Sequence, residues 1–287
     1  MRYVSFDHGG RQGFGLLSGN FIVDLTGKLA PAVVTLKQAI AAGLLAQAAT
    51  WHRSAAGIPV DQVRLLPVIP DPGKILCIGL NYEDHRNETE RPNSEYPTVF
   101  TRFAESQVGH QQPLHKPGLS DRFDYEAELA IVIGAAGYQV SEEHALDLVA
   151  GYACYNDGSV RDWQRHTSQF TPGKNFPATG GFGPALVTPD EVGDYRQLPI
   201  QLRLNGQVMQ DAKLSDLIFP IEKLITYCST FTPLAPGDVI VTGTPGGVGD
   251  RREPPVYLQD GDLVEVDIGA VGCLVNPVVI AEARAGI

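Results

Sequence analysis

Short runs of apolar residues, separated by turn-forming residues, recur along the chain and predict mainly strands. Residues 3–6 and 21–25 are apolar, β-branched or aromatic, and glycine-rich turns lie between them. Residues 35–51 are rich in alanine and leucine, which predicts a helix. Residues 59–72 then contain four prolines, as a linker does. The chain therefore begins with a small unit that ends at this linker.

The rest of the chain also favours strands over helices. The clearest strands are the apolar runs at 75–79, 129–134, 200–204, 239–242 and 263–268. Helices are expected at 141–149, 160–166 and 221–231. Strands and helices do not alternate regularly, which argues against a doubly wound parallel sheet. We predict an α+β, mostly β fold: a small N-terminal domain over residues 1–70, and a closed or rolled β structure with peripheral helices over residues 71–287.

Composition and charge narrow the classes of partner and compartment. The formal charge is −11, and nucleic-acid binding needs a basic surface, so we predict no nucleic-acid partner. No run approaches the about 18 apolar residues of a membrane helix, and the N-terminus lacks the apolar segment of a signal peptide. We therefore predict a cytoplasmic protein without a membrane partner. The four cysteines form no CxxC pair, which argues against a zinc site.

A pair of glutamates opens the most apolar predicted strand. Glu126 and Glu128 point to the same face of this strand, and the continuous apolar run that follows predicts that both faces are buried. Two buried carboxylates repel each other and lose hydration, and a divalent cation relieves both costs. The alternative is a solvent-facing pair at the start of a strand.

Asp157 ends a second apolar strand, within the turn sequence Asn-Asp-Gly. By itself it is typical of an ordinary turn. Together with Glu126 and Glu128 it offers three oxygen ligands, which select Mg²⁺, Mn²⁺ or Ca²⁺ over Zn²⁺. We predict a divalent metal site, with Mg²⁺ as the first choice.

Two further motifs carry groups for proton transfer and charge stabilisation. His85 and Glu88 are three residues apart in a predicted helix, so they share one face, where a carboxylate raises the basicity of the imidazole. The alternative is an incidental ion pair on a surface helix. Lys174 lies in a loop rich in glycine and proline, where it is either solvated or stabilises a developing enolate. The glycine-rich residues 241–249 allow close approach to a ligand but match no nucleotide-binding motif.

Six motifs in this order resemble the fumarylacetoacetate hydrolase family over residues 74–280. They are Ile78-Gly79-Leu80-Asn81-Tyr82 with His85 and Glu88, Glu126-x-Glu128, Asp157 with Arg161 and Asp162, Gly173-Lys174-Asn175-Phe176, Asn205-Gly206 with Gln210, and Thr242-Gly243-Thr244-Pro245 with Gly247-Val248-Gly249. The resemblance implies a mixed β-sandwich roll, often preceded by a small N-terminal domain, in a chain that forms a homodimer.

The resemblance also implies roles for the residues of these motifs. Glu126, Glu128 and Asp157 match the metal ligands of the family. His85 and Glu88 match the pair that activates water, and Lys174 matches the active-site lysine. Gln210 and Thr244 match residues that contact the keto-acid end of the substrate, and we expect Tyr82 to contact the substrate as well.

The chain departs from the family pattern on the strand after the His–Glu pair. Many members have Phe-x-Lys-Pro there, whereas this chain has Arg102 in place of the lysine and no proline. A guanidinium presents a planar fork that suits a carboxylate. Arg102 is therefore expected either to bind the second carboxylate of a dianionic substrate or to lie on the surface beside Glu105.

The predicted reaction is hydrolysis of a C–C bond in a 1,3-diketo acid, an acylpyruvate or a dicarboxylate such as fumarylpyruvate, in aromatic or related catabolism. His85 and Glu88 activate water, and the metal and Lys174 stabilise the leaving enolate. Decarboxylation, isomerisation or dehydration of an oxo acid at the same site is the alternative. A third hypothesis is a metal-binding homologue without activity.

Overall fold

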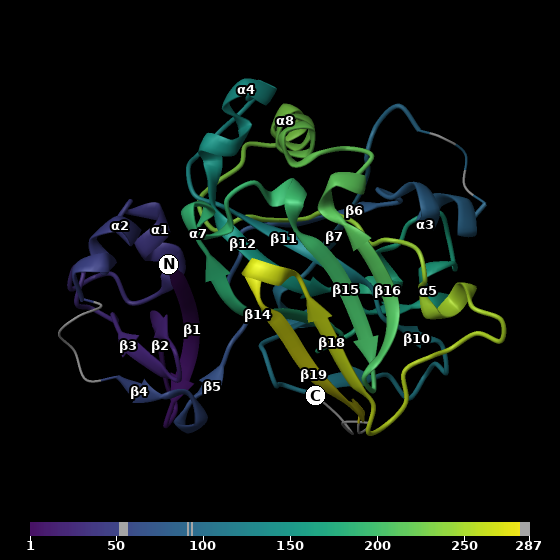
Figure 1. Cartoon of the computed structure of the whole chain (residues 1–287), viewed down its shortest axis with the longest axis horizontal. Helices are drawn as coiled ribbons and strands as arrows, with labels where there is room; N and C mark the ends of the chain where they lie inside the picture. Colours follow the sequence, from purple (N-terminus) through teal and green to yellow (C-terminus); the bar gives the residue numbers. More distant parts are fainter. Residues whose placement is uncertain (52–56, 91, 93, 282–287) are drawn as a thin grey trace.

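A large mixed sheet joins the N-terminal strands to the centre of the molecule (Figure 1). The computed structural model describes residues 1–51, 57–90, 92 and 94–281. The strands of this sheet are β1 (Arg2–His8), β2 (Arg11–Ser18), β3 (Phe21–Asp24), β4 (Ile58–Pro59), β5 (Arg64–Leu65), β6 (Ile75–Gly79), β7 (Thr98–Arg102), β8 (Gln107–Val108), β11 (Ala127–Ile133), β12 (Val149–Asn156), β14 (Gly180–Val187) and β17 (Val239–Val241). Their order is β4-β3-β2-β1-β14-β12-β11-β17-β6-β7, with β5 beside β1 and β8 beside β14.

A second sheet packs in front of β11, β12 and β14 in the view of Figure 1. Its strands are β9 (Leu114–Lys116), β15 (Pro199–Leu204), β16 (Gln207–Lys213), β18 (Leu263–Asp267) and β19 (Cys273–Ile280), in the order β16-β15-β18-β19-β9. The short strands β10 (Phe123–Asp124) and β13 (Ser159–Val160) pair separately. The predicted strand-rich α+β class is confirmed, and the described strands form open mixed sheets instead of a closed barrel.

Short helices lie around these sheets. They are α1 (Leu36–Ala41), α2 (Leu45–Ala48), α3 (Glu83–Glu88), α4 (Glu142–Ala145), α5 (Arg161–Gln164), α6 (Thr171–Lys174), α7 (Pro189–Val192) and α8 (Ile221–Phe231). The bounds predicted for α8 are confirmed. The single helix predicted over 35–51 is wrong, because the chain turns at Gly43, whose φ of 67° is left-handed. The helix predicted over 141–149 is too long, because Val149 already pairs in β12.

The strand β11 is buried on both faces, as its continuous apolar sequence predicts. Leu129 and Ile131 face a core shared with the five-stranded sheet, whereas Ala130 and Val132 face a second core. Because side chains alternate along a strand, Glu126 and Glu128 share the face of Ala130 and continue the second core toward its polar end. The register of one strand thus decides where the glutamates lie.

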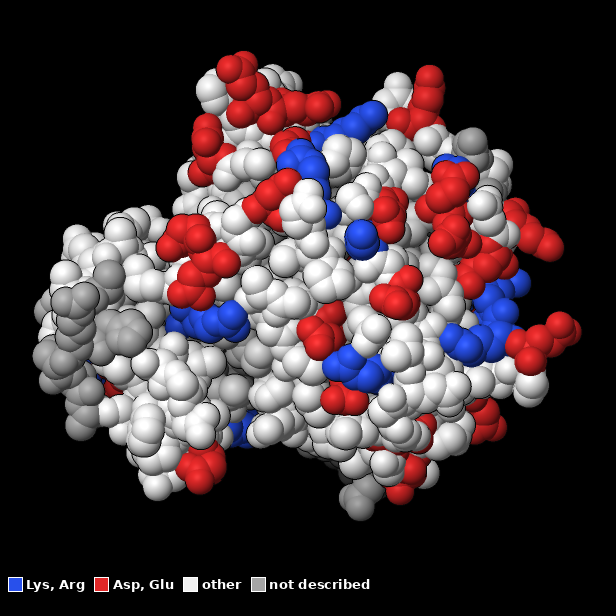
Figure 2. All heavy atoms as spheres, in the orientation of Figure 1, with Lys and Arg blue, Asp and Glu red and all other residues white. Residues whose placement is uncertain are grey.

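The N-terminal strands share that second core. β1 pairs with β14 through Arg2 and Tyr3, and Phe14 packs in the same cluster as Ala130. The division of the chain near residue 70 into two domains stays a prediction. No helix among the described residues is long and apolar enough to span a bilayer. On the face shown in Figure 2, acidic side chains are interspersed with basic ones.

Candidate active site

Three carboxylates meet where β11 begins and β12 ends. These strands are antiparallel, with Ala127 opposite Asn156, so the residues just outside the pair are neighbours. The Asp157 N–H donates to the Glu126 carbonyl at 2.9 Å. Carboxylate oxygens of Glu126, Glu128 and Asp157 lie within 4.8 Å of one another, and all three residues are buried. The strand register therefore brings together the predicted metal ligands.

Two of these carboxylates are neutralised by cations of the chain itself. The Lys174 ammonium donates to Glu126 Oε2 at 2.6 Å and to Asp157 Oδ2 at 2.5 Å. Arg161 Nη1 lies 2.7 Å from Glu126 Oε1. Burial raises the pKa of Glu126, but the charges of Lys174 and Arg161 outweigh it and lower that pKa to about 2. The same partners raise the pKa of Lys174 despite its burial, so it stays charged.

Glu128 has no such cation. Its Oε2 accepts the Gly243 N–H at 2.5 Å, and no ion pair to Glu128 occurs in the described part of the chain. Burial and the negative charges of Asp157 and Glu126 raise the pKa of Glu128 well above its ordinary value. The buried cluster thus has one carboxylate more than its cations neutralise. A divalent cation bound by the three oxygens fits this donor set and this charge.

The predicted His–Glu pair is formed in α3. His85 Nδ1 lies 2.7 Å from Glu88 Oε1, and the other oxygen of Glu88 accepts the Gly247 N–H at 3.0 Å. The carboxylate thus links the helix to the glycine-rich loop of residues 241–249. Gly243 there has a φ of 102°, and a Cβ on it would lie 2.7 Å from Asn81 Cβ, so this close approach requires glycine.

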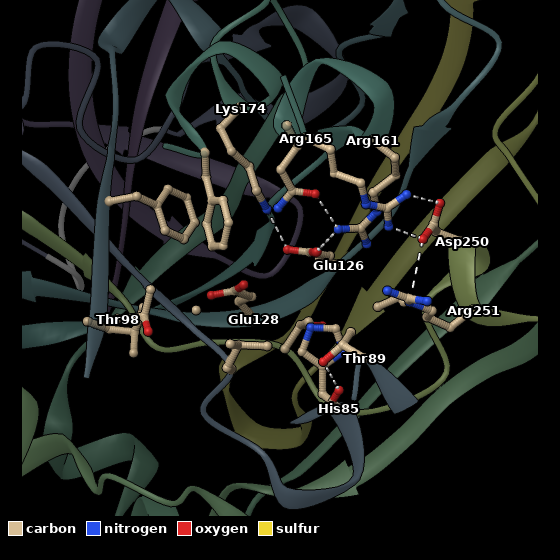
Figure 3. Close-up of a pocket in the computed structure, with 18 of the residues that line it drawn as sticks. His85, Thr89, Thr98, Glu126, Glu128, Arg161, Arg165, Lys174, Asp250 and Arg251 are labelled. Atoms are coloured by element: carbon tan, nitrogen blue, oxygen red, sulfur yellow. Dashed lines mark hydrogen bonds and ion pairs between the residues drawn. The ribbon is translucent and has the colours of Figure 1, made fainter. Parts of the chain in front are cut away.

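One cavity of about 350 Å³ joins these groups (Figure 3). Its lining includes five of the predicted site residues, namely His85, Glu126, Glu128, Lys174 and Thr244. Glu88 and Asp157 lie one contact behind this lining, through His85 and Lys174. The proton-transfer pair and the carboxylate cluster therefore face the same small volume.

Gln210 supports the cavity from outside. Its amide donates to Thr244 Oγ1 and to the Pro245 carbonyl, each at 2.8 Å, and its oxygen accepts the Ala127 N–H at 2.9 Å. All of these partners are protein groups, so Gln210 positions Thr244 next to β11. The structure places Thr244, and not Gln210, at the cavity.

Tyr82 lies in the apolar core instead of in the cavity lining. It precedes α3, and its hydroxyl is buried without a hydrogen-bond partner among the described residues. Burial is the main cause that raises the pKa of this phenol, followed by the negative charge of Glu128. The structure therefore does not place Tyr82 where the sequence analysis expected a substrate contact.

Arg102 is neither on the surface nor in the lining of the catalytic cavity. Its side chain is 0% exposed and its Nη1 donates to Asp157 Oδ1 at 2.6 Å and to the Gly158 carbonyl at 2.9 Å. Nη2 and Nε donate to Thr179 Oγ1 at 2.8 Å and Ser106 Oγ at 3.2 Å. The surface alternative beside Glu105 is wrong. The geometry makes Arg102 a positioning residue that fixes the Asp157 carboxylate.

Sequence analysis assigned no role to a group of charged residues next to the cavity. The fully buried Asp124 pairs with Arg161, and the loop that carries Asp250 and Arg251 lines the outer part of the cavity. Asp124 directly precedes the Glu126 motif, and Arg161 belongs to the Asp157 motif. Their proximity to matched motifs was a usable signal, whereas nothing in the spacing marked Asp250 or Arg251.

Replacing Arg102 by lysine tests its positioning role. Lysine keeps the charge but loses the fork that holds Asp157, Gly158 and Thr179 together. Because groups behind metal ligands fix their orientation, we expect Mg²⁺ affinity to fall about 10–100-fold in isothermal titration calorimetry. An unchanged affinity in a folded R102K variant contradicts the role.

The pH dependence of metal binding tests the excess carboxylate. With its raised pKa, Glu128 holds a proton in the metal-free protein, and that stabilising contribution is lost as the pH rises through the folded-state pKa. Mg²⁺ needs the deprotonated form, so its effect grows in the same direction. We expect Mg²⁺ to raise Tm more at about pH 8 than at about pH 6. The E128Q variant should lose this difference, and a pH-independent Tm increase in the unmodified protein contradicts the assignment.

Known proteins share the sequence and the fold of this chain. Residues 74–279 match the model of the fumarylacetoacetate hydrolase C-terminal domain. A mitochondrial oxaloacetate tautomerase of Xenopus laevis is 44% identical over 221 residues, which are 76% of this chain and 69% of that protein. A fumarylacetoacetate hydrolase from Exiguobacterium antarcticum has a similar structure, with a TM-score of 0.87 and 34% identity over 98% of this chain and 100% of that chain.

A maleylpyruvate hydrolase from Sphingobium, whose structure was solved with manganese(II) and pyruvate, superposes with a TM-score of 0.83. It is 30% identical, over 98% of this chain and 100% of that chain. The family match, which covers most of the chain, agrees with the buried carboxylates and the His–Glu pair described above. The chain belongs to the fumarylacetoacetate hydrolase family of enzymes.

Proposed function

We propose that this protein interconverts the keto and enol forms of a short 2-oxo dicarboxylate such as oxaloacetate, at a divalent-metal centre. One observation carries the proposal: the His85–Glu88 pair and the carboxylate cluster with its excess negative charge line one cavity of about 350 Å³. A relative that is 44% identical is an oxaloacetate tautomerase, which supports this choice among the reactions of the family.

Glu126, Glu128 and Asp157 are the residues that would hold the metal, and Mg²⁺ is our first choice. When bound, the cation supplies Lewis acidity toward the oxygen atoms of the oxo acid. Without it, the buried carboxylates repel an anionic substrate. The charged Lys174 lines the same cavity and stabilises negative charge that develops on the substrate oxygen.

His85 is the proposed base that moves the proton. Glu88 accepts the hydrogen bond from Nδ1, which leaves the lone pair on Nε2 for a proton at substrate C3. Removal of that proton gives the enolate, and protonation of its oxygen gives the enol. In the opposite direction, the imidazolium returns the proton to C3. Glu88 fixes the tautomer and stabilises the imidazolium.

Hydrolysis of a C–C bond in an acylpyruvate is the second candidate. The maleylpyruvate hydrolase, with its bound manganese(II) and pyruvate, supports it, because the same base would deprotonate a water instead of C3. The leaving enolate of pyruvate would then carry its charge next to Lys174. Decarboxylation of the same oxo acid would need the enolate stabilisation but no base at His85. The homodimer and the cytoplasmic location stay predictions.

The H85N variant tests the role of the base. Loss of a positioned general base typically costs about 10²–10⁴-fold in rate. We expect the ketonisation of enol-oxaloacetate, followed by the ultraviolet absorbance of the enol, to slow by that factor. Mg²⁺ affinity should stay unchanged, because His85 contacts Glu88 and is outside the metal-ligand cluster.

The exposed His144, which pairs only with Asp147, provides a matched control, and H144N should keep the full rate. Undiminished ketonisation in H85N contradicts the tautomerase proposal. Pyruvate release from an acylpyruvate, without acceleration of oxaloacetate ketonisation in the unmodified protein, favours hydrolysis instead.

A further inference from the structure

One cation of the cavity lining is not used by the protein itself. Arg251 ends the short turn η7 (Gly249–Arg251), and its side chain is 36% exposed. Figure 3 shows its guanidinium directed into the cavity, below Asp250 and on the side of His85. A charged group in this place faces any molecule that reaches the carboxylate cluster.

The backbone of this turn is held rigidly by a buried charge. Asp124 Oδ1 accepts the Gly249 N–H at 2.9 Å, and its Oδ2 accepts the Asp250 N–H at 3.0 Å. Arg161 Nε donates to the same Asp124 Oδ2 at 2.8 Å. Because Asp124 is fully buried, Arg251 projects from a fixed position instead of from a loose loop.

The neighbouring arginines already have partners. Arg165 donates to both oxygens of Asp250, which also accepts the Tyr257 hydroxyl hydrogen at 2.8 Å. Burial raises the pKa of Asp250, but these hydrogen bonds outweigh it and hold that pKa below its ordinary value. Arg252 is bound by the Met209 and Gly247 carbonyls.

Arg251 itself makes only a weak contact of this kind. Its Nε lies 3.7 Å from Asp250 Oδ2, which is beyond hydrogen-bond distance. Its guanidinium donates no hydrogen bond within residues 1–51, 57–90, 92 and 94–281. The fork of Arg251 is therefore available to an anionic ligand.

We infer that Arg251 binds the second carboxylate of the substrate and makes the enzyme selective for dicarboxylates. The inference rests on the proposed function, which places the 2-oxo-carboxylate end at the inner carboxylate cluster. A guanidinium fork pairs with a carboxylate through two parallel hydrogen bonds. Arg251 thus takes the role that the sequence analysis considered for Arg102, whose donors are all used around Asp157.

The experiment compares two ligands that differ in one group. Oxaloacetate and 2-oxobutyrate share the 2-oxo-carboxylate end, but oxaloacetate has a carboxylate where 2-oxobutyrate has a methyl group. Their dissociation constants are measured by titration calorimetry with Mg²⁺ present, for the unmodified protein, for R251Q and for R11Q. The exposed Arg11 lies in β2, outside the cavity lining, so R11Q controls for the loss of one positive charge.

We expect R251Q to weaken oxaloacetate binding about 10-fold or more, as for the loss of a charged hydrogen bond, and to leave 2-oxobutyrate within about twofold. R11Q should change neither dissociation constant. Equal effects of R251Q on both ligands, or no effect on oxaloacetate, overturn the inference. Binding does not require turnover, so a protein that binds oxaloacetate through Arg251 but does not ketonise its enol contradicts the proposed function and leaves this inference standing.

Discussion

The excess negative charge of the buried carboxylate cluster is the constraint on which the site depends. Lys174 and Arg161 neutralise Glu126, and Lys174 and Arg102 neutralise Asp157, whereas Glu128 receives only a backbone N–H. An uncompensated carboxylate in the protein interior is costly, and the chain supplies no further cation to it. A bound divalent cation resolves this imbalance, and it gives the cavity the positive potential that an oxo acid needs.

The fold brings these charges together at the ends of the two central antiparallel strands. β11 is apolar on both faces, so the register of its core side chains also fixes the direction of Glu126 and Glu128. Groups outside the cavity then hold the charged side chains in place. Arg102 holds Asp157, Gln210 holds Thr244, and Asp124 holds the turn that carries Arg251. The rigid surroundings thus position both the metal ligands and the substrate-binding groups.

The local sequence was sufficient to predict β11, α8 and the convergence of the three carboxylates, because each depends on periodicity or on a short motif. Interactions between distant segments were not predictable in this way. Arg102 contacts residues 55 and 77 positions later in the chain, and no spacing rule connects them. The broken helix at Gly43 and the early start of β12 at Val149 reflect a left-handed residue and a strand pairing that override helical composition. Arg251 was missed because its role follows from what its neighbours bind.

The central claim, that Glu128 completes a divalent-metal site, is tested most directly by titrating the protein with Mn²⁺ and following the free ion by electron paramagnetic resonance. The account predicts one tight Mn²⁺ site per chain in the unmodified protein, and no tight site in a folded E128Q variant. Equal Mn²⁺ binding by the two proteins, or no binding by either, would contradict it.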